Sequence, residues 1–395
     1  MSRPILPGST GADGRPATLG VMGGGQLGRM FVHAAQSMGY LTAVLDPDPV
    51  SPAGRVADYH VQSGYLDEQG LAQLMQRCAA ITTEFENVPA QALLTLGAHR
   101  PVSPGAQAVA ICQHRAEEKA HFLRCGVRCA PHALIEVAED LDRIADDLFP
   151  GLLKTAQLGY DGKGQVAVAT VADLAAAWGE LKNVPCLLEK RLPLKGELSV
   201  IVARNAAGEC VNLPPQQNLH RAGILAVTQV PAPDIDAETA ALAIRQAMLL
   251  AESMHYVGVL CIEFFVLEDG SLVANEMAPR PHNSGHYSID ACDVSQFELQ
   301  VRAMASLPLV QPRLHSAALM LNRLGDLWFA PGTGRERTPP WAEVLALPGV
   351  HLHLYGKAGA RPGRKMGHLT ITAADAASAR AVALEAAARL GLAPF

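Results

Sequence analysis

Short strand-forming runs alternate with helix-forming runs at the start of the chain, and this order constrains the fold most strongly. Strands are predicted at 18–24, 40–46 and 80–83, and helices at 26–37 and 67–77. Strands and helices that alternate in this way build a parallel sheet with helices on both faces. The predicted fold class for this part of the chain is therefore α/β.

The loop after the first strand carries a glycine pattern with two interpretations. Gly23, Gly25 and Gly28 satisfy G-x-G-x-x-G, and Asp46 follows Gly28 by 18 residues. This is the fingerprint of a Rossmann dinucleotide site, which favours an NAD(P) dehydrogenase. The glycines by themselves require only that backbone amides at a helix N-terminus receive an anion, commonly a phosphate. A loop that holds part of a phosphorylated substrate is therefore the second interpretation.

A second constraint comes from residues 257–280, where Asp269-Gly270 separates two apolar runs. A two-residue turn at that point pairs Glu263 with Glu276 across a β-hairpin. Like charges held opposite each other, with Cβ atoms about 5 Å apart, are destabilising unless a cation lies between them. Carboxylate oxygens select a hard ion such as Mg²⁺, which often bridges to phosphate groups. The pair predicts a magnesium-dependent nucleoside triphosphate site; the alternative is a solvated hairpin with two incidental acids.

The segment GLLKTAQLGYDGKGQVAV predicts a strand, a glycine-rich loop and a second strand. Glycines let the backbone approach a ligand closely, and Lys154 and Lys163 add positive charge on either side. The glycines are Gly159, Gly162 and Gly164. A flexible loop of this kind closes over phosphates in nucleotide-binding enzymes, although an ordinary hairpin turn has the same composition. Further on, Glu189 ends an apolar strand that is suited to line an adenine pocket.

Two loops stiffened by proline and glycine carry most of the clustered basic residues. The first contains Arg280, His282, Asn283, Ser284, His286 and Asp290, and the second contains Arg361, Arg364, Lys365 and His368. Arginine pairs with phosphate or carboxylate through two parallel hydrogen bonds, so the two loops predict an anionic substrate. A solvated surface loop is the alternative for either cluster taken alone.

The composition excludes several classes of protein. The chain has 395 residues, of which 18% are charged and 49% hydrophobic, and its formal net charge is −6. This length is sufficient for two or three domains, and the charge gives no overall basic surface for nucleic acid. No apolar run approaches the roughly 20 residues that span a bilayer. Residues 1–17 are rich in Gly, Pro, Ser and Thr and are predicted to be a disordered extension.

Taken in order, these segments closely resemble one enzyme family. The motifs are GGGQLGRM, ITTEFENV, GYDGKGQ, the Glu-x₁₂-Glu hairpin, NEMAPRPHNSGH and RPGRKMGH. In this sequence they resemble the N5-carboxyaminoimidazole ribonucleotide synthetases, which are ATP-grasp enzymes and form the ATPase subunit of phosphoribosylaminoimidazole carboxylase. The resemblance covers about residues 18–390.

The resemblance implies a three-part α/β and α+β architecture. Residues 18–114 would form a Rossmann-like parallel-sheet domain that precedes the ATP-grasp domain. Residues 115–311 would form the ATP-grasp domain, with a mobile lid at about 125–197. Residues 312–395 would form a small, β-rich C-terminal domain.

The resemblance also implies a reaction of de novo purine biosynthesis. ATP, 5-aminoimidazole ribonucleotide and bicarbonate would react through carboxyphosphate to give N5-carboxyaminoimidazole ribonucleotide, ADP and phosphate. The cofactors would be ATP and Mg²⁺, with Mn²⁺ as the alternative ion. The enzyme would be a cytoplasmic homodimer that acts on small molecules and binds neither nucleic acid nor membrane.

Matching positions assign roles to individual residues. ATP would be bound by Arg115, Lys154, Gly159, Tyr160, Asp161, Gly162, Lys163, Gly164, Gln165, Glu189, Lys190, Leu192, Glu197, His220, Asn275 and Glu276. The metal would be held by Glu263 and Glu276. The ribonucleotide and bicarbonate would be bound by Gln26, Leu27, Glu84, Arg280, Asn283, Ser284, His286, Arg364 and Lys365. The catalytic residues would be Lys365, Arg280, Tyr160, Asp161 and His286.

One departure from the wider ATP-grasp superfamily affects the metal site. Many members have an Asn two residues after the second metal glutamate, where this chain has Ala278. We therefore expect only two protein carboxylates at the metal, with waters or phosphates completing its coordination. The alternative functions are another ATP-grasp ligase, such as formate-dependent glycinamide ribonucleotide transformylase, and a non-catalytic nucleotide-binding regulator.

Overall fold

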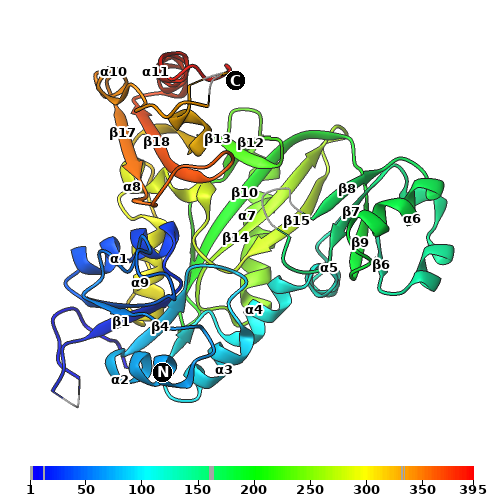
Figure 1. Cartoon of the computed structure of the whole chain (residues 1–395). Coiled ribbons are helices and arrows are strands. Elements are labelled where there is room, and N and C mark those ends of the chain that lie inside the picture. Colours follow the sequence, from blue (N-terminus) through cyan, green and yellow to red (C-terminus); the bar gives the residue numbers. More distant parts are fainter. Residues whose placement is uncertain (1–2, 12–13, 160–163, 331, 333) are drawn as a thin grey trace.

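A five-stranded parallel sheet forms the N-terminal part of the protein, in a computed structural model that describes residues 3–11, 14–159, 164–330, 332 and 334–395 (Figure 1). Its strands, in the order β3-β2-β1-β4-β5, are β1 (Thr18–Met22), β2 (Leu41–Leu45), β3 (Tyr59–Val61), β4 (Ala80–Thr83) and β5 (Val102–Ser103). The helices of this part are α1 (Gln26–Ser37), α2 (Glu68–Arg77), α3 (Ala90–Gly97) and α4 (Ala106–Gln113). The predicted parallel α/β sheet is confirmed.

Part of the predicted disordered extension contacts the folded protein. Among its described residues, the Ile5 amide donates to the Ala305 carbonyl oxygen at 2.9 Å. The Tyr40 hydroxyl donates to the Ile5 carbonyl oxygen at 2.6 Å, and Ala17 is buried. Composition alone predicted disorder because it could not show that Ile5 packs against the N-terminal core.

A nine-stranded sheet runs through the middle of the molecule and into its C-terminal part (Figure 1). Its main path is β15-β14-β10-β12-β13-β16-β18-β17, and β11 pairs with β10. The strands are β10 (Leu194–Arg204), β11 (Cys210–Asn212), β12 (Gln216–Arg221), β13 (Ile224–Val230), β14 (Gly258–Leu267), β15 (Leu272–Ala278), β16 (Ala317–Leu324), β17 (Val350–Leu354) and β18 (Lys365–Ala373). The β-rich C-terminal part is therefore hydrogen-bonded to the central sheet through the β13–β16 pair.

The β14–β15 hairpin brings Glu263 opposite Glu276, as predicted, but it does so by a different route. Near the turn, Val266 pairs with Leu272, and the Leu267 amide donates to the Ser271 carbonyl oxygen at 2.9 Å. The loop therefore has three residues, not the predicted two, and this shifts the register by one position. A β-bulge at Asn275, where the register changes, restores the pairing of the two glutamates.

A separate four-stranded antiparallel sheet, in the order β6-β9-β7-β8, lies on the opposite side of the molecule from the N-terminal sheet (Figure 1). Its elements are β6 (His132–Ile135), β7 (Gly151–Thr155), β8 (Gln165–Val168), β9 (Cys186–Lys190), α6 (Val171–Glu180) and the 3₁₀ turns Ala138–Arg143 and Asp146–Leu148. Residues 115–150 are thus helical only in α5 (Arg115–Arg124) and these turns. The strand β6 forms because β9 supplies its hydrogen-bonding partner from a distant part of the sequence.

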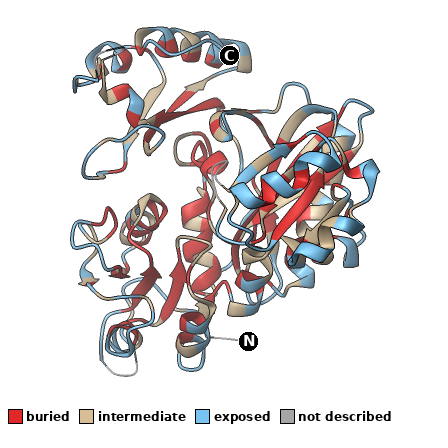
Figure 2. Cartoon of the chain, turned by 45° about the vertical axis from the view of Figure 1, so that its right-hand side comes forward, coloured by how far each residue is buried: buried red, intermediate tan, exposed pale blue. Residues whose placement is uncertain are grey.

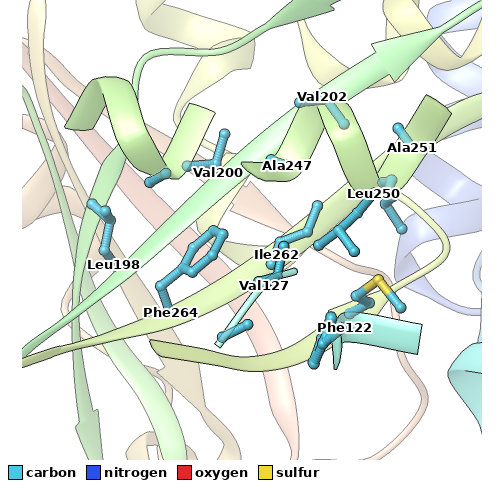
Figure 3. Packing of buried hydrophobic residues seen from close by; sticks show 14 of the residues in the cluster. Phe122, Val127, Leu198, Val200, Val202, Ala247, Leu250, Ala251, Ile262 and Phe264 are labelled. Atoms are coloured by element: carbon cyan, nitrogen blue, oxygen red, sulfur yellow. The ribbon is translucent and has the colours of Figure 1, made fainter. Parts of the chain in front are cut away.

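The largest core lies between the central sheet and helices α5 and α7 (Ala237–Ser253) (Figure 3). Side chains such as Val200 and Phe264 from the sheet contact Leu250 and Ala247 of α7. Burying each large apolar side chain contributes about 1.5–3 kcal/mol. This layer therefore holds β10 and the β14–β15 hairpin in place. The remaining helices are α8 (Ser288–Ala291), α9 (Gln296–Met304), α10 (Trp341–Leu345) and α11 (Ala376–Arg389).

Buried residues concentrate on the sheets and on the inner faces of the helices, whereas outer helix faces and loops are exposed (Figure 2). Within the described part of the chain, no helix combines the length and the apolar character needed to cross a bilayer.

Candidate active site

A cavity of about 550 Å³ lies where the N-terminal sheet, the central sheet and the four-stranded sheet meet. It brings together the following predicted residues: Gln26, Leu27, Glu84, Arg115, Lys154, Gly159, Gly164, Gln165, Glu197, His220, Glu263, Asn275, Glu276, Arg280, Asn283 and Lys365. These residues span most of the sequence, so only the tertiary fold makes them neighbours. A volume of this size suits a nucleotide with a second small substrate.

The two opposed glutamates line this cavity and differ in their environments. Burial, followed by the like charge of Glu276, raises the pKa of Glu263 to about 7. Burial also acts to raise the pKa of Glu276, but Arg115 and Lys154 outweigh it and hold that pKa below its ordinary value. The Arg115 guanidinium donates from Nη1 to Glu276 Oε2 at 3.3 Å. Glu263 has His282 as its neighbour, with Nε2 3.5 Å from Oε1.

Helix α5 fixes the bulge beside Glu276 through side chains that the sequence did not single out. Lys119 Nζ donates to the Asn275 carbonyl oxygen at 2.5 Å, and the Met277 amide donates to Glu118 Oε1 at 2.5 Å. Burial raises the pKa of Glu118 to about 8. The helical spacing of Arg115, Glu118 and Lys119 places them on one face, and this was the signal available in the sequence.

Lys154 and Lys119 both contact the carboxylate of Glu189, at 2.7 Å and 3.3 Å. All three side chains are buried. Burial acts to raise the pKa of Glu189, but the two lysines outweigh it and lower that pKa to about 2. The carboxylate of Glu189 therefore does not line the cavity, although its strand was predicted to line an adenine pocket. It orders Lys154, which does line the cavity. Two cations share one anion here, so the group carries net positive charge next to the glutamates.

The glycine loop after β1 binds carboxylates of the protein itself. The Gly24 amide donates to Asp46 Oδ2 at 2.7 Å, and Tyr65 donates its hydroxyl to the same atom at 2.7 Å. The amides of Gly25 and Gly28 donate to the two oxygens of Glu84, at 2.9 Å and 3.2 Å. In the dinucleotide interpretation Asp46 binds the ribose and the amides bind the pyrophosphate, so the structure argues against NAD(P) at this loop.

The part of the cavity wall near the N-terminal sheet carries Arg280 and Lys365 together with the acids Glu84 and Glu86. Arg280 forms an ion pair with Glu86; burial acts to raise the pKa of Glu86, but Arg280 outweighs it and lowers that pKa. The charge of Lys365, at the start of β18, also acts to lower the pKa of Glu86 and of Glu263. Glu86 was missed in the sequence, although it lies within the ITTEFENV motif.

Several predicted residues lie elsewhere. His286 is buried behind the cavity, where Gln296 contacts its Nδ1 at 3.1 Å and His368 packs at a centroid distance of 4.8 Å. Ser284 is also buried and accepts a hydrogen bond from Ser199 at 2.8 Å. Arg364 donates to two carbonyl oxygens of its own loop, at 2.8 and 3.0 Å. These residues, with Glu189, Lys190 and Leu192, do not line the cavity. Tyr160, Asp161, Gly162 and Lys163 lie outside the described residues.

The donor set fits a hard divalent cation at the glutamate pair. Both donors are carboxylates, burial and then their mutual repulsion raise the pKa of Glu263, and the Oδ1 atom of Asn275 is buried without a hydrogen-bond partner in the described structure. The described part of the chain contains no group of three or more His, Cys, Asp or Glu side chains arranged to hold a metal. Two protein carboxylates are typical of Mg²⁺ sites that take their other ligands from water and phosphate.

Comparison with known proteins places this geometry in a family. Residues 17–113 match the ribonucleotide synthetase preATP-grasp domain, 120–297 the ATP-grasp domain, and 318–382 the phosphoribosylaminoimidazole carboxylase C-terminal domain. The N5-carboxyaminoimidazole ribonucleotide synthase of Brucella melitensis is 42% identical over 90% of this chain and 96% of its own length. This chain belongs to the N5-carboxyaminoimidazole ribonucleotide synthetase family.

Other members of this synthetase family agree in sequence and in fold. The synthase of Bacillus subtilis is 39% identical over 90% of this chain and 91% of its own length. The Staphylococcus aureus synthetase complexed with ADP superposes with a TM-score of 0.86 at 36% identity, covering 98% and 99% of the two chains. The Aspergillus clavatus synthase in complex with ADP and the aminoimidazole ribonucleotide gives a TM-score of 0.87 at 31% identity, covering 95% and 99%. The chain is an ATP-dependent ligase of the ATP-grasp type.

Proposed function

We propose that this enzyme carboxylates 5-aminoimidazole ribonucleotide with bicarbonate and ATP, giving N5-carboxyaminoimidazole ribonucleotide, ADP and phosphate. The observation that carries the proposal is one cavity that two groups of residues line together. The first group comprises the opposed glutamates with Arg115 and Lys154, and the second comprises Gln26, Glu84, Arg280 and Lys365. The first group suits a triphosphate with its metal ion, and the cations of the second suit an anionic nucleotide and bicarbonate.

The reaction has two steps in which bonds form and break in balance. A bicarbonate oxygen attacks the γ-phosphorus of ATP, the bond to the β-phosphate oxygen breaks, and carboxyphosphate and ADP result. The exocyclic amine of the ribonucleotide then attacks the carboxyl carbon, phosphate leaves, and the amine loses a proton. Because carboxyphosphate is exposed to hydrolysis in water, closure of the cavity belongs to the mechanism.

The residues of the chain act mainly by position and charge. Arg115 and Lys154 neutralise charge on the transferred phosphoryl group, and Glu189 keeps Lys154 in place. Glu263 and Glu276 would hold Mg²⁺, which, when bound, stabilises charge on the phosphate oxygens. Of the residues predicted to be catalytic, Arg280 and Lys365 keep this role, since both line the cavity. His286 does not keep it, because its ring is packed in the core.

Nearby residues would complete the nucleotide site. His220 and Glu197 form an ion pair on neighbouring strands that line the cavity. Burial acts to lower the pKa of His220, but Glu197 outweighs it and raises that pKa, so the imidazolium is favoured. Lys190, the last residue of β9, and Leu192, two residues beyond it, are retained as backbone contacts to the base, and Tyr160 to Lys163 as part of the lid.

We also propose the domain limits 18–114, 115–311 and 312–395, a homodimeric assembly, and action in the cytoplasm. The three matched family models agree with these limits, and only the first begins one residue earlier, at 17, which supports the division. The dimer can be measured by light scattering on the purified protein; a monomeric mass at micromolar concentration would contradict it.

A coupled assay of ADP release tests the function directly. ADP should form only when ATP, bicarbonate and 5-aminoimidazole ribonucleotide are all present with Mg²⁺, and Mn²⁺ should replace Mg²⁺. Faster turnover with formate and glycinamide ribonucleotide would instead assign the chain to another ATP-grasp ligase. Binding of NAD(P)H without ATP-dependent turnover would support the dehydrogenase alternative.

A further inference from the structure

A second cavity, of about 190 Å³, lies in the C-terminal part of the protein, and the proposed function does not use it. Its walls come from the β12–β13 turn, β16, the 3₁₀ turn Gly325–Trp328, α11 and the C-terminal tail. Apolar side chains dominate them, among them Val227, Leu321, Leu327 and Ala387. An engineered cavity of about 150 Å³ with similar walls holds benzene, so this cavity has room for one small ring.

A buried arginine lies in this apolar wall. Arg323 follows Leu319 and Leu321 at alternate positions, on the face of β16 that packs against α11. Only 3% of Arg323 is exposed. Its Nε donates to the Leu321 carbonyl oxygen at 3.2 Å. Its Nη1 is buried and has no hydrogen-bond partner, and the residue forms no ion pair with any described residue.

An unpaired guanidinium in an apolar wall is costly unless a ligand supplies the missing anion. Burial lowers the pKa of Arg323 to about 9, which still leaves it charged at neutral pH. Other charged groups at the cavity have partners of their own. Arg221 donates to the carbonyl oxygens of Ala393 and Pro394, and Asp326 accepts from the Gly363 amide at 2.8 Å.

We propose that this cavity is a binding site for a small monocarboxylate with an apolar body, whose carboxylate pairs with Arg323. One guanidinium balances one negative charge, and the fork of an arginine matches a carboxylate through two hydrogen bonds. A phosphate dianion fits less well, because the second cation at the cavity, Arg221, already donates to the carbonyl oxygens of Ala393 and Pro394, and Asp326 adds negative charge at the edge.

The site lies directly behind residues assigned to the ribonucleotide. Asn322 donates to the Leu225 carbonyl oxygen at 2.6 Å and exchanges hydrogen bonds with Asn283 at 2.7 and 3.0 Å. Leu225 lines both cavities. A carboxylate bound at Arg323 should therefore change the KM for the ribonucleotide; this consequence alone rests on the proposed function.

The binding itself is tested on the purified full-length protein without substrates. Benzoate should raise the melting temperature in a saturable way, whereas equal concentrations of benzamide, chloride or inorganic phosphate should not. Arg323→Met should weaken benzoate binding about tenfold or more, since a charged hydrogen bond is lost. Arg143→Gln is the matched control, because Arg143 is an exposed arginine in a different part of the protein. Equal shifts with benzoate and benzamide, or an unchanged response in Arg323→Met, would overturn the site.

Two further measurements keep the result decisive. If Arg323→Met does not fold, Ala387→Leu should abolish the benzoate response by filling the cavity while keeping Arg323. Crystals soaked in 4-bromobenzoate should show bromine in the cavity, and bromine only at other places would overturn the proposal. Benzoate binding with an unchanged KM for the ribonucleotide would refute the coupling to Asn283. The melting-temperature and crystal measurements need no turnover, so their results do not depend on the proposed reaction.

Discussion

Replacing Glu263 by Gln should stabilise the metal-free protein at alkaline pH while it abolishes function. In the wild type, burial and the facing Glu276 raise the pKa of Glu263 from 4.5 to about 7. The unfolded chain, with a pKa near 4.5, then binds fewer protons than the folded chain between these two values. Stability contributed by this group therefore falls as pH rises from 4.5 to 7 and stays low above that range.

The magnitude follows from the size of the shift. A pKa difference of this size corresponds to about 3 kcal/mol at pH 8, about 2 kcal/mol at pH 6 and under about 1 kcal/mol at pH 5. Glu263→Gln removes the charge and keeps the shape of the side chain, which is only 13% exposed. The variant should thus gain up to about 3 kcal/mol of unfolding free energy at pH 8, and little at pH 5.

Urea unfolding in EDTA at pH 5, 6, 7 and 8, followed by circular dichroism, measures this gain. Glu268→Gln is the matched control, because Glu268 is an exposed acid beside the turn of the same hairpin. With saturating Mg²⁺ and ATP the order should reverse, since the wild type is then stabilised by binding. A variant with no extra stability at pH 8, or with the same gain at pH 5 and pH 8, would refute the idea of two facing carboxylates that repel each other.

Three further predictions concern the active site. Glu276→Gln should lower kcat by a factor of about 10² or more in steady-state ADP release, because the phosphate charge loses one support; near-normal activity would contradict its assignment. Lys365→Ala should raise the KM for the ribonucleotide more than the KM for ATP, and equal losses would misplace its loop. Lys119→Met should destabilise the protein by about 3–5 kcal/mol in urea and weaken ATP binding in calorimetry, because it releases the Asn275 carbonyl and leaves Glu189 with one cation. An unchanged ATP affinity in Lys119→Met would limit it to a structural role.

Local patterns in the sequence were sufficient to predict the elements that contain the active site. The two apolar runs on either side of Asp269-Gly270 identified a hairpin with two facing glutamates, and the structure has this pair. The alternation of strands and helices at 18–83 likewise predicted the parallel sheet. These features depend on residues close in sequence, for which propensity and spacing are informative.

The tertiary structure decided how those elements become a site. The bulge at Asn275, held from α5 by Lys119, corrects a turn that is one residue longer than predicted. The glycine loop resembled a dinucleotide site, but its Gly25 and Gly28 amides donate to the carboxylate of Glu84, which lies 59 and 56 residues further along the chain. Packing also turned His286 into the core, although its motif predicted a catalytic role. Sequence spacing determines which face of a strand or helix a side chain occupies, but the partner on that face is set by the packing of distant elements.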